Sequence, residues 1–148
     1  MPGFVVDASV SAAWFLPDEA TPLTEAALQA TATAEVWVPA IWLLEMGNLL
    51  LNAQRRKRIT DAKRLELVAA ASALRLRVDR EPVSMVDLDA LAAHFALTAY
   101  DAAYLELALR RNLPLATLDA ALLAALPEAG LSRFELGPGQ EGEYASRT

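Results

Sequence analysis

Four acidic residues stand at positions where carboxylates could do chemistry. Asp7 directly follows the short apolar run FVV, and Asp119 directly follows the run PLATL. Asp101 opens the helical stretch before the second run, and Glu45 interrupts an otherwise apolar helical stretch. In open α/β sheets, ligands bind beyond the carboxyl ends of the strands, which is where Asp7 and Asp119 are expected to lie. These four residues therefore form the candidate site.

Carboxylates brought together in this way repel one another and need a counter-charge. At about 4 Å, a pair of unit charges costs roughly 1 kcal/mol in bulk water and about 4 kcal/mol at an effective dielectric of 20. Oxygen ligands alone favour a hard cation such as Mg²⁺ or Mn²⁺. A metal ion held by carboxylates can activate water, position a phosphate and neutralise developing charge. The pattern thus points to metal-dependent phosphodiester hydrolysis.

A purely structural interpretation of the same acids stays open at this point. Asp7 and Asp119 could cap the helices that follow them, and Thr98 with Asp101 fits a capping box. A cap does not account for Glu45 in the middle of a helix, and no basic residue lies within four positions of it. Glu45 instead shares a helical face with Asn48 and Asn52, which favours a cleft, a partner or an ion beside it.

The elements that would position these residues alternate along the chain. Short apolar or β-branched runs predict strands, and Ala/Leu-rich stretches between them predict helices. Pro39 suits the first turn of its helix, and Pro127-Glu128 is expected to end the last helix early. Strands separated by helices imply parallel pairing and a three-layer α/β/α sandwich. The predicted strands are 4–6, 36–38, 76–78, 114–118 and 133–136, and the predicted helices are 9–15, 20–33, 40–54, 60–74, 84–95, 98–111 and 119–126.

Composition narrows the possible functions. The chain has 148 residues, the size of one domain, which we place at 1–136 with a disordered tail at 137–148. It has no cysteine and one histidine, which excludes thiol nucleophiles, iron–sulfur clusters and Cys- or His-rich zinc sites. No stretch predicts a signal peptide or a membrane span, so we expect a cytoplasmic protein with no membrane partner.

The net charge of −6 conceals a strong segregation. Residues 1–54 carry a net charge of −6, residues 55–80 one of +6, and residues 81–148 one of −6. The densest part of this basic island is Arg55-Arg56-Lys57-Arg58. A nuclease needs phosphate contacts, so the island and the Arg110-Arg111 pair are the candidate nucleic-acid contacts.

Three segments together resemble the PIN-domain family, with the closest likeness to VapC-type ribonuclease toxins of type II toxin–antitoxin pairs. The segments are VVDASVSAAWFLPDE at 5–19, VPAIWLLEMGNLL at 38–50 and LTAYDAAYLELALRRNLPLATLD at 97–119. The resemblance implies a parallel sheet of order 3-2-1-4-5 flanked by about seven helices. It also implies endoribonuclease activity on structured RNA such as tRNA or rRNA, a homodimer, and inhibition by a VapB-like antitoxin.

The resemblance also implies a role for individual residues. Asp7, Glu45, Asp101 and Asp119 correspond to the family's acidic quartet around Mg²⁺ or Mn²⁺, with Asp7 and Asp101 as the most direct ligands. Ser9 and Thr117 match hydroxyl positions that orient the carboxylates. The expected phosphate contacts are Arg55, Arg56, Arg58 and Arg110.

Two other classes of protein remain as alternatives. A phosphoaspartate protein also places aspartates at strand ends, but it should have a D-x-D start or a late lysine, and no lysine follows Lys63. A catalytically silent PIN-like binding module, kept for dimer and antitoxin contacts, predicts no binding of divalent cations.

Overall fold

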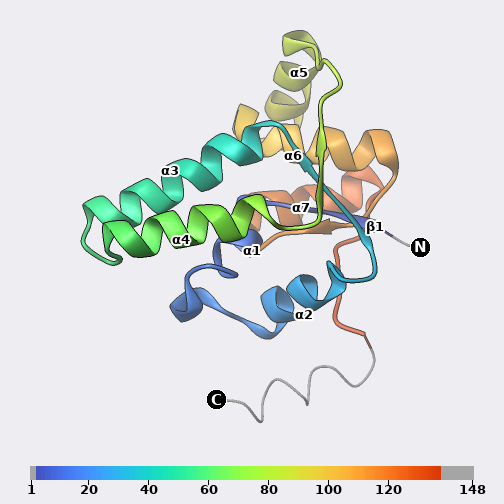
Figure 1. Ribbon diagram of the computed structural model, residues 1–148. Coiled ribbons are helices and arrows are strands. Elements are labelled where there is room, and N and C mark those ends of the chain that lie inside the picture. The colour runs from blue at the N-terminus through green and yellow to red at the C-terminus, as the bar shows by residue number, and fades with distance from the viewer. Residues whose placement is uncertain (1–2, 138–148) are drawn as a thin grey trace.

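The computed structural model describes residues 3–137 (Figure 1). The predicted tail at 137–148 lies outside the described residues, apart from Gly137. The strands are β1 (Gly3–Val6), β2 (Glu35–Pro39), β3 (Leu76–Asp79) and β4 (Leu115–Ala116). The α-helices are α1 (Ala8–Ala12), α2 (Pro22–Ala30), α3 (Ile41–Arg55), α4 (Asp61–Ser72), α5 (Met85–Phe95), α6 (Ala99–Arg111) and α7 (Ala120–Ala129), with a 3₁₀ turn at Pro17–Glu19.

The strands form one parallel sheet of order β3-β2-β1-β4. This confirms the predicted fold class and the order of the first four strands. The predicted fifth strand is reduced to a single bridge between Leu115 and Arg133, beside which the Phe134 N–H donates to the Leu115 carbonyl at 2.9 Å. Because β4 has only two residues, a neighbouring strand cannot form a longer ladder with it.

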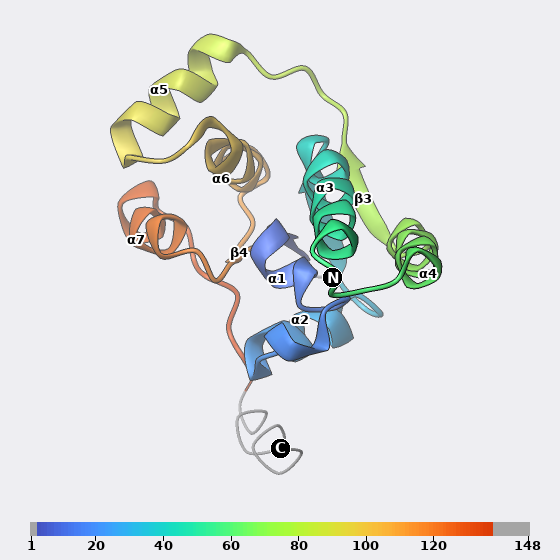
Figure 2. The same ribbon diagram turned by 90° about the vertical axis from the view of Figure 1, so that its left-hand side faces the viewer.

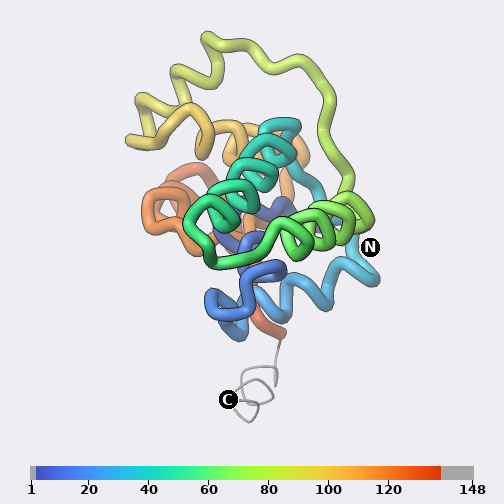
Figure 3. Tube along the Cα trace, turned by 60° about the vertical axis from the view of Figure 1, so that its left-hand side comes forward, coloured from blue at the N-terminus to red at the C-terminus, as the bar shows by residue number. Residues whose placement is uncertain are grey.

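The helices cover both faces of this sheet. The connections from β1 through β3 run one way across the sheet and the connection to β4 runs back, so right-handed crossovers place α1–α4 and α5–α7 on opposite faces. Figure 2 shows α5, α6 and α7 on one side of the molecule and α3 and α4 on the other. Helices α3 and α4 lie side by side as a hairpin (Figure 3). The predicted three layers are therefore present.

The core lies where α6 crosses the sheet. Its centre consists of fully buried strand and helix residues: Val5, Val6, Val36, Val38, Tyr104, Leu105, Leu107, Leu115 and Ala116. Strands β1 and β2 approach so closely that a Cβ at Gly3 would lie 2.5 Å from the Glu35 carbonyl oxygen. Strand β1, whose last three residues are buried, is followed directly by Asp7.

Two proline predictions were wrong. Pro39 is the last residue of β2 rather than part of a helix, and α3 begins after Ala40. Pro127 does not end the last helix, because α7 continues through it to Ala129. Pro127 cannot donate the usual hydrogen bond to the carbonyl of Leu123, but α7 continues for only two more residues after it. The helix ends instead at Gly130, whose φ of +73° suits a left-handed cap.

Within residues 3–137, no helix has both the length and the apolar character that crossing a membrane requires.

Candidate active site

Asp7 lies at the centre of the site, between the end of β1 and the start of α1. It caps α1, and its Oδ1 accepts hydrogen bonds from the Val10 N–H at 3.1 Å and from the Ser9 hydroxyl at 2.6 Å. The Thr117 hydroxyl donates to its Oδ2. The residue is 4 % exposed, and no Lys, Arg or His within residues 3–137 pairs with it. Asp7 is thus a buried, hydrogen-bonded carboxylate without a counter-ion.

The electrostatics of Asp7 follow from this setting. Burial raises the pKa of Asp7, and the nearby Asp101 carboxylate raises that pKa further. The hydrogen bonds from Ser9, Thr117 and Val10 act in the opposite direction, because they favour the ionised form. A carboxylate in this state gains from any cation that reaches it.

Ser9 and Thr117 connect the ends of β1 and β4. While donating to Asp7, the Ser9 hydroxyl accepts from the Leu118 N–H at 2.9 Å. The Thr117 hydroxyl accepts from the Asp119 N–H, also at 2.9 Å. Each hydroxyl therefore has its donor and an acceptor lone pair in use, which leaves it a single orientation. This arrangement agrees with the orienting role that the resemblance implies for both residues.

Asp119 and Asp101 lie beside Asp7 on different elements. Asp119 caps α7 by accepting from the Leu122 N–H at 2.9 Å. Asp101 lies in the first turn of α6, where its own N–H is capped by the Thr98 hydroxyl at 3.1 Å. Burial raises the pKa of Asp101, and the charge of Asp119 raises it further. Asp7 and Asp119 are caps and also members of an acidic group, so the two interpretations do not exclude each other.

Glu45 reaches this group through a residue that sequence reasoning missed. The hydroxyl of Tyr104, on α6, donates to Glu45 Oε1 at 2.6 Å across the gap between α6 and α3. Tyr104 is 1 % exposed, and burial, then the Glu45 carboxylate, raises its pKa above its ordinary value. Asp7 and Asp101 also raise it, which places the phenol among three of the four acids. Its spacing of three residues from Asp101 was the available signal, since it puts both on one helical face.

The four side chains offer the oxygen ligands that a hard divalent cation prefers, but they do not lie close enough together to form a complete coordination site. All four side chains offer carboxylate oxygens, and Asp7 is buried without a basic partner. Within residues 3–137, however, no three His, Cys, Asp or Glu side chains come together tightly enough to hold an ion. The carboxylates are coupled pairwise, Asp7 with Asp101 and Asp101 with Asp119.

The predicted phosphate contacts fall into different surroundings. Arg110 binds Asp79 at 2.6 Å, Glu81 at 3.0 Å and Glu106 at 2.7 Å, about 14 Å along the α6 axis from Asp101. Arg58 binds Asp18 at 2.9 Å. In contrast, Arg55 and Arg56 are exposed, and neither makes a hydrogen bond or ion pair through its side chain in the part of the chain that the structure describes.

Comparison with known proteins places this site in a family. The family model described as "PIN domain" matches residues 4–127, which include all four acids. The crystal structure of PAE2754 from Pyrobaculum aerophilum is similar in fold, with a TM-score of 0.61 and 24 % identity over 83 % of this chain and 84 % of that one. No curated protein matches the chain. PIN domains are typically metal-dependent nucleases and generally use Mg²⁺. On its match over most of its length, this chain belongs to the PIN domain family.

Proposed function

We propose that the chain is a Mg²⁺- or Mn²⁺-dependent endoribonuclease. The observation that carries the proposal is Asp7, a buried carboxylate held by three hydrogen bonds, facing Asp101 and lacking a basic partner among the described residues. Building such a group costs stability unless a cation completes it. Asp7 and Asp101 are the proposed direct ligands, and Glu45 and Asp119 complete the pocket.

Each residue has a defined task in this proposal. The bound cation supplies an activated water and neutralises charge at the scissile phosphate. Ser9 and Thr117 fix the rotamer of Asp7, and Tyr104 fixes that of Glu45. A carboxylate that does not bind the cation directly can accept the proton of the attacking water.

The test is hydrolysis of RNA by the purified chain with and without Mg²⁺ or Mn²⁺. We expect cleavage that requires the cation, and a loss of at least about a hundredfold in Asp7→Asn, since changing residues around a metal ligand already costs 10- to 100-fold. Asp89→Asn makes the same change at an exposed position of α5, should cleave at the wild-type rate and controls for the general effect of removing one carboxylate. Cleavage by Asp7→Asn at the wild-type rate would refute the assignment.

The VapC-like role is a further part of the proposal. It makes the chain a cytoplasmic, growth-inhibiting toxin that is silenced by a VapB-like antitoxin, with tRNA or rRNA as target. Induced expression should arrest growth in the wild type and not in Asp7→Asn, and RNA ends sequenced after induction should share one cut site. Growth arrest by both variants would separate toxicity from nuclease activity.

The proposed homodimer is supported by apolar side chains left on the surface. Helix α5 has no buried residue, and Met85 and Val86 at its start are 84 % and 76 % exposed. Leu43 on α3 is 48 % exposed. Sedimentation of the wild type should give a dimer in which a second copy buries Met85 and Val86. The double variant Met85→Glu with Val86→Glu should be a monomer, because burying two carboxylates is unfavourable. A monomeric wild type would overturn this part.

A silent binding module remains the second candidate. The observation in its favour is that no three ligands converge within residues 3–137. Calorimetric titration with Mn²⁺ separates the two: a nuclease should bind the ion, and a silent module should not.

A further inference from the structure

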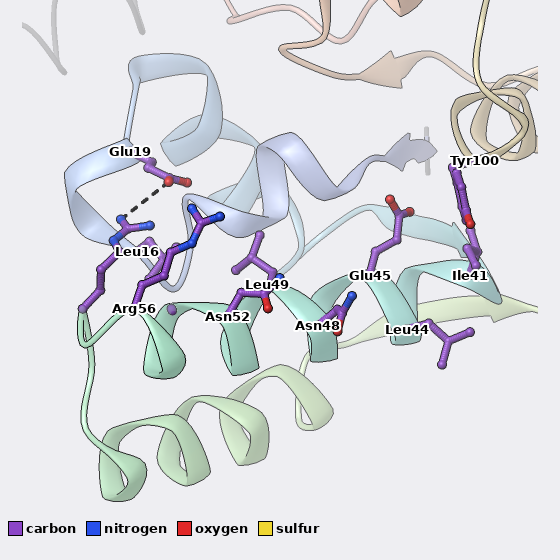
Figure 4. Close-up of a pocket in the computed structure, with 12 residues that line it drawn as sticks. Leu16, Glu19, Ile41, Leu44, Glu45, Asn48, Leu49, Asn52, Arg56 and Tyr100 are labelled. Atoms are coloured by element: carbon purple, nitrogen blue, oxygen red, sulfur yellow. Dashed lines mark ion pairs between the residues drawn. The ribbon is translucent and has the colours of Figure 1, made fainter.

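A groove with a volume of about 640 Å³ runs from the acidic site along one face of α3 (Figure 4). Glu45 and Tyr100 lie at one end, and Arg56 lies at the other. The opposite wall includes Leu16 and Glu19, from the segment after α1. Of the four acids of the candidate site, Glu45 lines the groove, so the groove reaches the proposed catalytic centre at Glu45.

Helix α3 lines the groove with a row of polar side chains in helical register, beside the apolar side chains of Ile41, Leu44, Leu49 and Ala53. Glu45, Asn48, Asn52 and Arg56 are spaced by three, four and four residues, so they follow one another along the same face of α3. At 1.5 Å per residue, the row extends about 16 Å along the axis. Asn48 and Asn52 are exposed, and their amide groups make no hydrogen bond within residues 3–137. These amides are free to donate to and accept from a ligand.

Arg56 is the available cation of the groove, and Arg58 is not. Arg58 also lines the groove, but its guanidinium binds Asp18 at 2.9 Å and Glu19 at 3.7 Å. Arg56 is exposed and, among the described residues, pairs with no acid. A free guanidinium about 16 Å along the helix from the carboxylates is placed to contact an anionic group distant from the site of chemistry.

Tyr100 supplies an aromatic surface at the catalytic end. Its side chain lines the groove and the residue is 60 % exposed, one position before Asp101. Unpaired nucleobases stack on exposed aromatic rings of this kind and hydrogen-bond through edges that a duplex would hide. The groove thus combines a stacking surface, free amides and one free cation in a line.

From this combination we infer that the groove binds a single-stranded stretch of RNA on one side of the scissile phosphate. A base stacks on Tyr100, Asn48 and Asn52 hydrogen-bond to base edges or ribose, and Arg56 contacts a phosphate. With a rise of about 3.4 Å per stacked nucleotide, the row accommodates at most about five nucleotides. This inference rests on the proposed nuclease function, since it takes the acidic site as the place of cleavage.

The experiment measures binding of a fluorescein-labelled single-stranded RNA octamer in Mg²⁺, with every variant built on Asp7→Asn so that the RNA stays intact. Arg56→Ala should weaken binding about three- to tenfold and lower the salt slope by about 1. Tyr100→Ala should weaken it about 5- to 100-fold through lost stacking. Arg133→Ala, which changes an exposed arginine outside the groove and outside the expected phosphate contacts, is the matched control and should change binding less than twofold.

Three results would overturn the inference. One is an equal loss of affinity in Arg56→Ala and Arg133→Ala, which would mean diffuse attraction. Another is a duplex of the same sequence binding as tightly as the single strand with the same sensitivity to Tyr100→Ala. The third is unchanged RNA binding in Asn48→Ala/Asn52→Ala together with loss of a protein partner, which would assign the groove to a polypeptide.

Cleavage assays with the native Asp7 distinguish this failure from failure of the proposed function. Groove-dependent RNA binding without any hydrolysis by the wild type refutes the nuclease and leaves the groove an RNA site. Metal-dependent hydrolysis with the same KM in wild type and Arg56→Ala refutes the groove assignment and leaves the nuclease. If both hold, Arg56→Ala raises KM while kcat stays within about twofold, since it removes binding common to ground and transition states.

Discussion

Two buried aspartates end parallel strands of the same sheet, and the chain treats them in opposite ways. Asp7 follows β1 and is 4 % exposed, and Asp79 ends β3 and is 5 % exposed. Asp79 binds Arg110 at 2.6 Å and Arg111 at 3.3 Å, and these guanidinium groups, Arg110 first, lower its pKa despite burial. Asp7 has hydroxyl and amide donors only, and burial raises its pKa.

The difference favours a structural role for Asp79 and supports the proposed metal-binding role of Asp7. Asp79 has its counter-charge within the fold, and Arg111 also stacks on Trp37 at 3.4 Å from the ring centroid. Such a carboxylate is complete and has little affinity left for a cation. Asp7 is oriented as strictly but left uncompensated, which is the state that a metal ligand requires.

The largest effect on stability is expected at the compensated site. Asp79→Asn should lower the free energy of unfolding by about 2–4 kcal/mol, because it leaves Arg110 and Arg111 partly buried beside a neutral group. Urea unfolding at pH 7 in EDTA measures it. Glu81→Gln, which removes an exposed partner of Arg110, is the control and should change stability by less than about 0.5 kcal/mol. The contrast fails if Asp7→Asn destabilises the chain more than Asp79→Asn does.

The gain in stability on adding a divalent cation should depend on Asp7 and not on Asp79. At 100 times its dissociation constant, Mn²⁺ should stabilise the wild type by about 2.7 kcal/mol, because only the folded chain assembles the site. The shift in unfolding midpoint should persist in Asp79→Asn and disappear in Asp7→Asn. An equal shift in Asp7→Asn would place the ion elsewhere in the molecule.

Acidification should remove both contributions, with opposite signs. The lowered pKa of Asp79 stabilises the fold above the unfolded value of about 3.9, and this contribution is lost as the pH falls below it. The raised pKa of Asp7 destabilises the ionised fold, and this penalty is relieved as the pH falls through the folded pKa toward 3.9. Each unit of difference between folded and unfolded pKa corresponds to about 1.4 kcal/mol.

Urea unfolding from pH 7 to pH 3 in EDTA measures these contributions. The stability deficit of Asp79→Asn should shrink only below about pH 4. The stability of Asp7→Asn relative to the wild type should already fall as the pH approaches about 4 from above, because the wild type then loses the penalty of its ionised Asp7. Asp89→Asn, at an exposed position, controls for the general effect of removing one charge. Parallel pH curves for Asp7→Asn and Asp79→Asn would show that the two carboxylates are equivalent.

The layered fold and the place of the acids were accessible from the sequence because they depend on local patterns. Apolar runs followed directly by Asp7 or Asp119 put these carboxylates at strand ends, and a right-handed crossover brings such ends to one edge. The order of the first four strands came only from the family resemblance. The predicted fifth strand, 133–136, is longer than the single bridge observed, because its own sequence does not show that its neighbour β4 has only two residues available for pairing.

Pairings between distant residues could not be predicted. Arg110 and Asp79 are 31 residues apart, and Arg58 and Asp18 are 40 apart, so the +6 island gave no sign of which cations are already paired. The bond from Tyr104 to Glu45 spans 59 residues. In the sequence, helix capping and metal binding are alternative interpretations of Asp7, but one carboxylate can do both because its two oxygens have different partners.

The smallest effect on stability is expected at Tyr104, which tests whether Glu45, like Asp7, is held in position by a hydrogen bond. Tyr104→Phe removes one hydroxyl from a buried ring without changing its shape, and Glu45 loses its only protein donor within residues 3–137. Since Glu45 is half-buried and water can replace the donor, stability should fall by only about 1 kcal/mol. The effect on the site should be larger in proportion, because a carboxylate that is free to rotate must be ordered when the cation binds. We therefore expect Mn²⁺ affinity to fall about tenfold in calorimetric titration.

The matched control for this change lies four residues earlier on the same helix. Tyr100→Phe also removes a phenol hydroxyl, but that hydroxyl has no hydrogen-bond partner in the part of the chain that the structure describes. Tyr100→Phe should leave both stability and Mn²⁺ affinity unchanged. If the two variants bind Mn²⁺ equally well, Tyr104 only fills the core, and Glu45 takes its position from α3 alone. If only Tyr104→Phe binds Mn²⁺ less tightly, Glu45 is held ready for the cation by a hydrogen bond, as Asp7 is. Both carboxylates then differ from Asp79, whose charge Arg110 and Arg111 already neutralise.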